Sequence, residues 1–291
     1  MSVSEPLAAR SLLFAPGDSP RKLEKASASD ADLVLCDLED SVPIPSKAAA
    51  RATVAQHLRS PRRQQMWVRI NPLDTPFALD DLAAIVPARP DGIMLPKAVR
   101  VDADRLHHYL SALEAAAGHP LGAIRVMVVA GETAPSMFGF GDYAACPRLA
   151  ALTWGAEDSA VALGASDNRD ADGGYEFPFQ LLRTLCLAGA AAAGVSAIET
   201  IHGDFRDPAG LERVAAKARR AGFRGMMAIH PDQVGVINRA FSPSAAELEH
   251  AGRIVAAFAA APRAGTIGLD GQMLDVPHLK RAQAVLAARR P

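Results

Sequence analysis

The chain has 291 residues, of which 49% are hydrophobic and 22% charged, and its formal net charge is -1. This composition is typical of a globular protein with a large core, and it gives no electrostatic preference for nucleic acid or membrane. No apolar run reaches the roughly 20 residues of a membrane span, and no basic segment followed by an apolar one opens the chain, so we expect a cytoplasmic protein.

Eight apolar runs, most of them followed by a segment with helical character, divide the first 240 residues. Strands are expected at residues 11–17, 33–40, 66–71, 92–97, 125–132, 149–155, 196–202 and 225–230. Helices are expected from Pro20, capped by Ser19, then at residues 46–58, 78–86, 102–117, 135–144, 177–193 and 208–221, and again from Pro231. A polar, irregular segment at residues 164–175 is predicted to be an exposed loop.

This alternation predicts an α/β fold, a parallel sheet closed into a (β/α)8 TIM barrel, because each strand is too apolar to be buried on one face only. An open doubly wound sheet is the alternative, but no G-x-G-x-x-G sequence follows the first strand. We expect a barrel domain at residues 1–240 and a C-terminal helical extension at 241–291. The extension contains a helix at residues 244–261, a glycine-rich turn and a final helix.

Polar side chains follow most of the predicted strands, and in a barrel they would all face one mouth. They are Asp37, Glu39, Asp40, Arg69, Asn71, Lys97, Glu132, Glu157, Asp158, His202 and His230. Glu132 and Asp158 end neighbouring strands, and two close carboxylates usually share a proton or a cation. We therefore interpret them as ligands of a divalent metal, with the cations nearby suiting an anionic substrate that the metal chelates.

Several of these residues have a simpler interpretation. Arg69 and Lys97 could only neutralise the acids of the second strand through ion pairs, and the acids at 39 and 40 are more often loop or capping residues than ligands. We do not assign His202 or His230 as metal ligands, because neither belongs to an H-x-H or H-x-x-x-H pattern. The three cysteines are far apart and indicate neither a disulfide framework nor a zinc motif.

The motifs RSLLFAPGDSPRKLEKA, LVLCDLEDSV, VRIN, LPKA, GET, WGAEDSAVALG and AIHPDQV occur in this order along the chain. Together they resemble the citrate lyase β-chain-like and malyl-CoA lyase family, within the HpcH/HpaI aldolase group, from about Arg10 to Asp275. The resemblance implies a TIM barrel with Mg²⁺ as the cofactor. It also implies reversible carbon–carbon cleavage of a 3-hydroxyacyl-CoA to an acyl-CoA and a 2-oxo acid.

By this resemblance, Glu132 and Asp158 match the family's magnesium ligands, with Glu132 also contacting the substrate. Arg69 matches its substrate-binding arginine, expected to stabilise the thioester enolate. The segment at residues 265–275 resembles the family's lid, whose aspartate, matching Asp275, enters a neighbouring subunit's active site as the acid-base. A homo-oligomer, most simply a trimer, is therefore expected. The alternative role of Asp275 is an ordinary N-cap, since it precedes a helix-opening proline.

Five further positions match the family's coenzyme A site. Phe14, Arg21 and Lys25 lie where the family binds the thioester, and the two basic residues suit the nucleotide phosphates. Some members have tyrosine at the position of Phe14, so a hydroxyl contact is lost here. Ile229 and His230 match a backbone segment that lines the coenzyme A pocket.

Three functions are compatible with the sequence. The first is a lyase acting on citramalyl-, malyl- or citryl-CoA. The second adds hydrolysis to the same enolate chemistry, as in a malyl-CoA thioesterase or a malate synthase-like enzyme. The third is the acyl lyase subunit of a citrate lyase complex.

Overall fold

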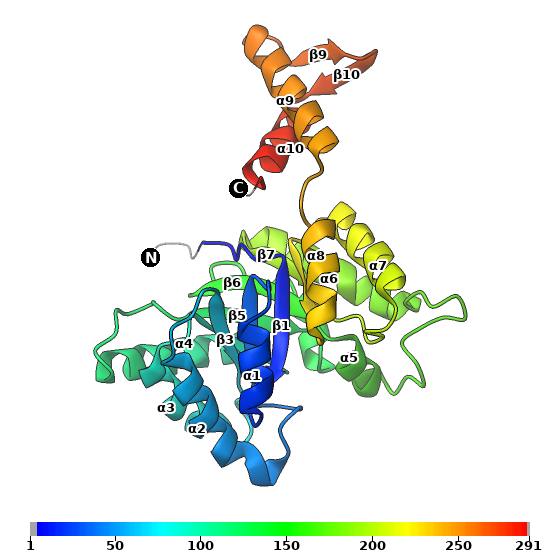
Figure 1. Cartoon of the computed structure of the whole chain (residues 1–291). Coiled ribbons are helices and arrows are strands. Elements are labelled where there is room, and N and C mark those ends of the chain that lie inside the picture. The colour runs from blue at the N-terminus through cyan, green and yellow to red at the C-terminus, as the bar shows by residue number, and fades with distance from the viewer. Residues whose placement is uncertain (1–4, 290–291) are drawn as a thin grey trace. The chain divides into compact units, whose positions relative to one another are not determined.

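The structure is a computed structural model that describes residues 5–289. The chain divides into two compact units, the first ending at Asn238 and the second beginning at Arg239. In the first unit, eight parallel strands follow one another in chain order, and β8 pairs with β1 to close a barrel (Figure 1). The predicted TIM barrel is confirmed, and the open sheet is excluded.

The strands are β1 Ser11–Pro16, β2 Leu33–Asp37, β3 Gln65–Arg69, β4 Gly92–Leu95, β5 Arg125–Ala130, β6 Leu149–Trp154, β7 Ser196–Glu199 and β8 Gly225–Ala228. The helices of this unit are α1 Pro20–Ser27, α2 Lys47–Leu58, α3 Ala78–Ile85, α4 Arg100–Ala116, α5 Ala156–Leu163, α6 Phe177–Ala193, α7 Pro208–Ala221 and α8 Pro231–Ala240. Short 3₁₀ turns occur at η1 Ile44–Ser46, η2 Val86–Ala88 and η3 Pro135–Phe138.

The strands are continuously apolar because both of their faces are buried. Side chains on the inner face fill the barrel. Helices lie around the outside of the strands (Figure 1). The interior includes Leu12, Leu35, Trp67, Met94, Met127 and Ile198. Strands β2, β4, β6, β7 and β8 are buried at every residue, as expected of parallel strands with covered faces.

The helices between β5 and α6 differ from the prediction in two places. The helix expected at residues 135–144 is wrong, because only the short turn η3 forms there. Gly139 and Gly141, which follow this turn, favour turn over helix. Conversely, α5 occupies residues that the sequence analysis left unassigned. Its first turn carries the two acids expected directly at the strand end, so a helix rather than a strand presents them.

The second unit is a small helix–hairpin–helix structure with its own core. It consists of α9 Ala245–Ala260, β9 Thr266–Leu269, β10 Gln272–Asp275 and α10 Val276–Ala287. Its core contains Ala251, Ile254, Phe258, Leu274 and Ala282. The predicted glycine-rich turn is the tip of the antiparallel hairpin, where Asp270 and Gly271 have positive φ angles of 52° and 76°. The hairpin strands themselves were not predicted.

No helix within residues 5–289 combines the length and the apolar character that a membrane crossing requires.

Candidate active site

A cavity of about 270 Å³ opens at the carboxyl ends of the barrel strands. Its lining includes five residues that the sequence analysis assigned to the site, which are Phe14, Arg69, Glu132, Asp158 and Ile229. Its apolar surface comes from Met94, Val129, Trp154, Ile201 and Met227. The barrel therefore collects, in one place, residues that are more than 200 positions apart in the chain.

The carboxyl group of Glu132 is fixed by the main chain around it. Glu132 follows β5 through Gly131, whose φ of 81° lies in the left-handed region. The backbone N–H of Lys97 donates a 2.7 Å hydrogen bond to Glu132 Oε2. A Cβ atom at Gly155 would lie 2.6 Å from Glu132 Oε1, so the absence of a side chain at Gly155 makes room for the carboxyl group.

Glu132 is only 6% exposed, and this burial dominates its electrostatics. The pKa of Glu132 is raised to about 8, mainly by burial; the hydrogen bond from the Lys97 N–H opposes this rise, and the charges of Asp158 and Glu39 add to it. A cation placed against this carboxyl group would favour its ionised form. The environment of Glu132 is therefore suited to a metal ligand.

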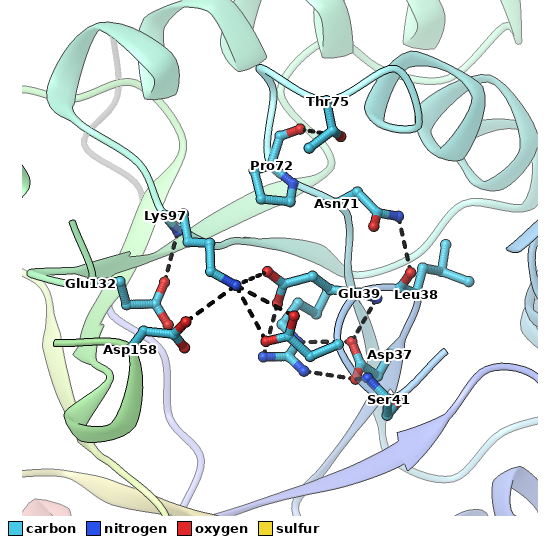
Figure 2. A network of polar contacts seen from close by, with 12 residues as sticks. Asp37, Leu38, Glu39, Ser41, Asn71, Pro72, Thr75, Lys97, Glu132 and Asp158 are labelled. Carbon is cyan, nitrogen blue, oxygen red and sulfur yellow. Dashed lines mark hydrogen bonds and ion pairs between the residues drawn. The ribbon is translucent and has the colours of Figure 1, made fainter. Parts of the chain in front are cut away.

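Asp158 approaches the same region from the first turn of α5. Helix α5 is tied to the end of β5 by Ser159, whose hydroxyl donates a 2.8 Å hydrogen bond to the carbonyl oxygen of Gly131. Asp158 Oδ1 lies 3.4 Å from Lys97 Nζ, and the Asp158 side chain is 34% exposed. The two predicted ligands thus lie on the same side of Lys97, which contacts Glu132 through its backbone and Asp158 through its side chain (Figure 2).

Arg69 lies between the acids that follow β2 and the aromatic ring of Phe14. Its Nε and Nη2 atoms donate hydrogen bonds of 2.7 Å each to the two carboxylate oxygens of Asp37. Nη1 lies 3.0 Å from Glu39 Oε2, and the guanidinium carbon lies 4.8 Å from the centre of the Phe14 ring. Although burial lowers the pKa of Arg69, Asp37 and Glu39 outweigh it and raise the pKa above its ordinary value.

Two buried side chains, Lys47 and Asn71, donate hydrogen bonds to the main chain of the loop after β2. Lys47 Nζ donates to the carbonyl oxygens of Leu38 and Glu39, at 2.8 and 3.0 Å. Asn71 Nδ2 donates to the carbonyl oxygen of Leu38 at 2.9 Å and to Asp81 Oδ2 at 2.6 Å. Asn71 therefore supports the loop instead of facing substrate. Lys47 was missed by the sequence analysis because it begins an alanine-rich helix and belongs to none of the quoted motifs.

Lys97 contacts more acids of the site than any residue the sequence analysis assigned to a role. Its Nζ lies 2.6 Å from Glu39 Oε1 and 3.2 Å from Asp40 Oδ2, besides the contact with Asp158. The simpler interpretation of Arg69 and Lys97 as ion-pair partners is therefore present in the structure. For Arg69 it does not exclude contact with a substrate, since Arg69 also lines the cavity.

The charges around the cavity are unbalanced. Six carboxylates lie around two cations, Arg69 and Lys97, which leaves an excess of four negative charges when all are ionised; the acids are Asp37, Glu39, Asp40, Glu132, Glu157 and Asp158. Within residues 5–289, no three His, Cys, Asp or Glu side chains are arranged to enclose a metal ion. Mg²⁺ does not need such a cage, because one or two carboxylates, waters and substrate oxygens commonly hold it. Glu132 and Asp158 fit this kind of site.

The remaining coenzyme A residues have varied surroundings. Arg21 and Lys25 are exposed on α1 and do not line the cavity. The His230 ring stacks on Phe205 at 4.8 Å between centroids. The backbone N–H of Ile229 donates to Gln233 Oε1 at 2.8 Å. These contacts agree with a structural rather than a metal-binding role for His230.

His202 and Glu157, also near the barrel mouth, have no assigned role. The buried Nε2 atom of His202 has no hydrogen-bond partner among residues 5–289, and burial lowers the pKa of this imidazole. Glu157 Oε1 accepts a 3.0 Å hydrogen bond from Asn168 Nδ2. This bond ties α5 to the polar segment that follows it.

Asp275 belongs to the second unit, where it ends β10 and occupies the N-cap position of α10. Its backbone N–H donates to His278 Nδ1 at 3.2 Å, and the same nitrogen lies 2.5 Å from Asp275 Oδ1. The hydrogen bond with His278 lowers the pKa of Asp275. Asp275 thus occupies the N-cap position, and its acid-base role stays a prediction.

Comparison with known proteins identifies the family. Residues 10–231 match the family described as HpcH/HpaI aldolase/citrate lyase. A (3S)-malyl-CoA thioesterase of Cereibacter sphaeroides is 35% identical over 286 residues, covering 96% of this chain and 93% of that protein. The citrate lyase subunit beta of Haemophilus influenzae is 32% identical over 286 residues, covering 95% of both chains.

Solved structures agree with these relatives. The protein CitE of Mycobacterium tuberculosis, crystallised with magnesium, acetoacetate and coenzyme A, superposes with a TM-score of 0.81 at 32% identity, covering 97% of this chain and 98% of that one. A citrate lyase beta subunit from the same organism, complexed with oxaloacetate and magnesium, has a TM-score of 0.69 at 33% identity, covering 81% and 98%. The chain therefore belongs to the HpcH/HpaI aldolase/citrate lyase family, whose relatives named here include a lyase subunit and a thioesterase.

Proposed function

We propose that the protein is a Mg²⁺-dependent carbon–carbon lyase acting on a 3-hydroxyacyl-CoA of the citramalyl-, malyl- or citryl-CoA type. Its products would be an acyl-CoA and a 2-oxo acid. The observation that carries this proposal is the cavity in which the buried Glu132 meets Asp158 and Arg69. Similar structures hold magnesium together with acetoacetate and coenzyme A, or with oxaloacetate, which supports both the metal and the substrate class.

In this proposal Glu132 and Asp158 hold the metal. Mg²⁺ would supply a Lewis acid for the carboxylate and adjacent oxygen of the oxo acid. Arg69 is kept charged by Asp37 and is held in a fixed orientation by the bidentate pair and the Phe14 ring. Such a preorganised donor is suited to stabilising the enolate of the thioester, where negative charge develops as the bond breaks.

An acid must protonate that enolate, and the same group removes the proton in the reverse direction. Because Glu132 and Asp158 would be engaged by the metal, we assign this role to Asp275 of a neighbouring subunit in a homo-oligomer, most simply a trimer. The contact with His278 lowers the pKa of Asp275, so this carboxylate is ionised at neutral pH and ready to accept a proton in the condensation direction.

We assign the coenzyme A thioester to Phe14, Arg21, Lys25, Ile229 and His230. Phe14 and Ile229 line the cavity, whereas Arg21 and Lys25 are exposed on α1. Two exposed cations on a neighbouring helix suit the phosphates of a nucleotide whose thioester end reaches into the cavity. A lid role for the second unit follows from the same proposal.

Thioester hydrolysis is the second candidate function, and the 35% identity to a (3S)-malyl-CoA thioesterase favours it. The discriminating experiment incubates the purified chain and Mg²⁺ with citramalyl-, malyl- and citryl-CoA in turn. Lyase activity releases a 2-oxo acid and an acyl-CoA without free coenzyme A. A thioesterase releases free coenzyme A in proportion to turnover. If none of the three free esters reacts, the proposed autonomous lyase is wrong and a role as a citrate lyase subunit is favoured.

A further inference from the structure

Lys97 contacts the acids of the site through both its main chain and its side chain. Its backbone N–H donates to Glu132 Oε2 at 2.7 Å. Its Nζ lies 2.6 Å from Glu39 Oε1, 3.2 Å from Asp40 Oδ2 and 3.4 Å from Asp158 Oδ1. Figure 2 shows the Lys97 side chain running between the two proposed metal ligands on one side and the β2 acids on the other. One residue therefore contacts four acids of the site, Glu39, Asp40, Glu132 and Asp158.

The backbone of Lys97 is also unusual. Its φ angle is 50°, in the left-handed region that residues with a side chain rarely adopt. Such a conformation persists where surrounding contacts fix it, and it is concentrated at functional sites. Here those contacts are the hydrogen bond to Glu132 and the three ion pairs of the ammonium group.

The three ion pairs of Lys97 are not equivalent. The contact with Asp158 is the longest, and the contact with Glu39, which is only 3% exposed, is the shortest. We infer that the Lys97 ammonium competes with Mg²⁺ for Asp158, an inference that rests on the proposed metal site. The ammonium pairs with Asp158 when the metal is absent and releases Asp158 when the metal binds. The ammonium then keeps Glu39 and Asp40 as partners, so the exchange needs only a small displacement of the side chain.

The ammonium has two opposite effects on the site. It offsets repulsion among the acids in the metal-free protein, where they outnumber the cations, and it therefore stabilises that form. It also lowers the affinity for Mg²⁺, because binding must break the contact with Asp158. Lys97 is in this sense a positioning residue that sets the affinity for the metal, and it is not among the residues that line the cavity.

The test is a calorimetric titration of the substrate-free protein with MgCl₂ alone. Lys97→Met removes the charge but retains the backbone N–H that contacts Glu132. We expect this variant to bind Mg²⁺ roughly fivefold more tightly, from a coupling of the size measured for partly exposed ion pairs. Its metal-free Tm should fall by about 2–4 °C, and Mg²⁺ should restore more of the Tm than in the parent protein. Lys97→Arg keeps the competing charge and should bind Mg²⁺ more weakly than Lys97→Met.

Arg10→Met is the matched control. It removes a cation that lies 2.9 Å from Asp32, at the start of β1 and outside the cavity lining. It should lower the Tm without changing Mg²⁺ affinity. If Lys97→Met does not fold, Lys97→Gln removes the same charge while keeping a polar side chain, and its affinity should rise in the same way.

Equal or weaker Mg²⁺ binding by the folded neutral variant overturns the inference about Lys97, provided that the parent protein binds Mg²⁺ and Glu132→Gln does not. If the parent protein shows no Mg²⁺ binding, the metal site of the proposed function fails together with the inference. The two failures are therefore distinguishable in one series of titrations.

Discussion

The carboxyl group of Glu132 packs directly against the main chain of Gly155. A Cβ atom at Gly155 would come within 2.6 Å of Glu132 Oε1 and 2.8 Å of its Cγ. The backbone of Gly155, with φ of -118° and ψ of 107°, is acceptable for any residue. The glycine is therefore required by the proximity of Glu132 and not by backbone strain.

This contact leads to a prediction for Gly155→Ala. The added methyl group should displace the Glu132 carboxyl group and weaken Mg²⁺ binding by at least about tenfold, since losing one of two carboxylate ligands removes much of the site. Calorimetric titration with MgCl₂ measures the effect. Gly252→Ala, where an added Cβ meets nothing within 4 Å, is the control and should bind Mg²⁺ normally. Unchanged binding by Gly155→Ala would show that the two groups are not closely packed in solution.

The raised pKa of Glu132 predicts how the stability of the metal-free protein depends on pH. Burial raises this pKa from 4.5 to about 8, so folding disfavours the ionised form. The parent protein should therefore lose stability relative to Glu132→Gln as the pH rises from about 4.5 to about 8. The difference in Tm between the two proteins, measured across this range without metal, gives the result. A difference that does not change with pH contradicts the assigned environment of Glu132.

The proposed ligands predict loss of metal-dependent turnover. Glu132→Ala and Asp158→Ala should each abolish activity that depends on Mg²⁺ while leaving the circular dichroism spectrum unchanged, because neither side chain belongs to the apolar core. Turnover at increasing Mg²⁺ concentration is the measurement. Magnesium dependence identical to that of the parent protein in either variant would remove the metal hypothesis.

Arg69→Lys should not behave as a conservative change. The planar guanidinium of Arg69 holds Asp37 through two hydrogen bonds, whereas a lysine offers only a point charge. Both the paired hydrogen bonds with Asp37 and the orientation of the side chain toward substrate are therefore lost. We expect kcat/KM to fall on the order of 10²-fold, the scale seen when one preorganised donor is removed.

Arg10→Lys is the control for that prediction. Arg10 also makes two side-chain hydrogen bonds to one carboxylate, through Nε and Nη2 to Asp32 at 2.9 Å each, but it does not line the cavity. It should lower stability without lowering kcat/KM. Parent-level kcat/KM in Arg69→Lys would exclude Arg69 from the enolate role.

The acid-base role of Asp275 predicts complementation between subunits. Asp275→Asn and Arg69→Ala should each be inactive alone, and co-assembly should restore part of the activity because some sites receive both intact residues. Asp270→Asn, at the hairpin tip of the same unit, should remain active. A fully active Asp275→Asn variant, or a fully active monomer by light scattering, would show that Asp275 is only a helix cap.

The sequence predicted the barrel and several of the residues at the carboxyl ends of its strands. Residues such as 33–36 and 149–152 are apolar without alternation, and this local pattern is sufficient to indicate parallel strands buried on both faces. Because the carboxyl ends of such strands share one edge, Arg69 and Glu132 were expected together. Both line the cavity.

The interactions within the mouth were decided by the tertiary structure. Glu39 is 58 positions before Lys97 in the chain, and Asp158 is 61 positions after it. Which of the two acids Lys97 contacts depends on distances in the folded chain that no local pattern encodes. Glycine is likewise required at position 155 because of the Glu132 side chain, which follows a different strand, β5. In the second unit, β9 and β10 have four residues each and are largely exposed, so only their pairing and packing against α9 and α10 define them as strands. Local periodicity therefore determined the strands of the barrel, while the hairpin of the second unit, the positions of the charges and the close contacts followed from distances that exist only in the folded chain.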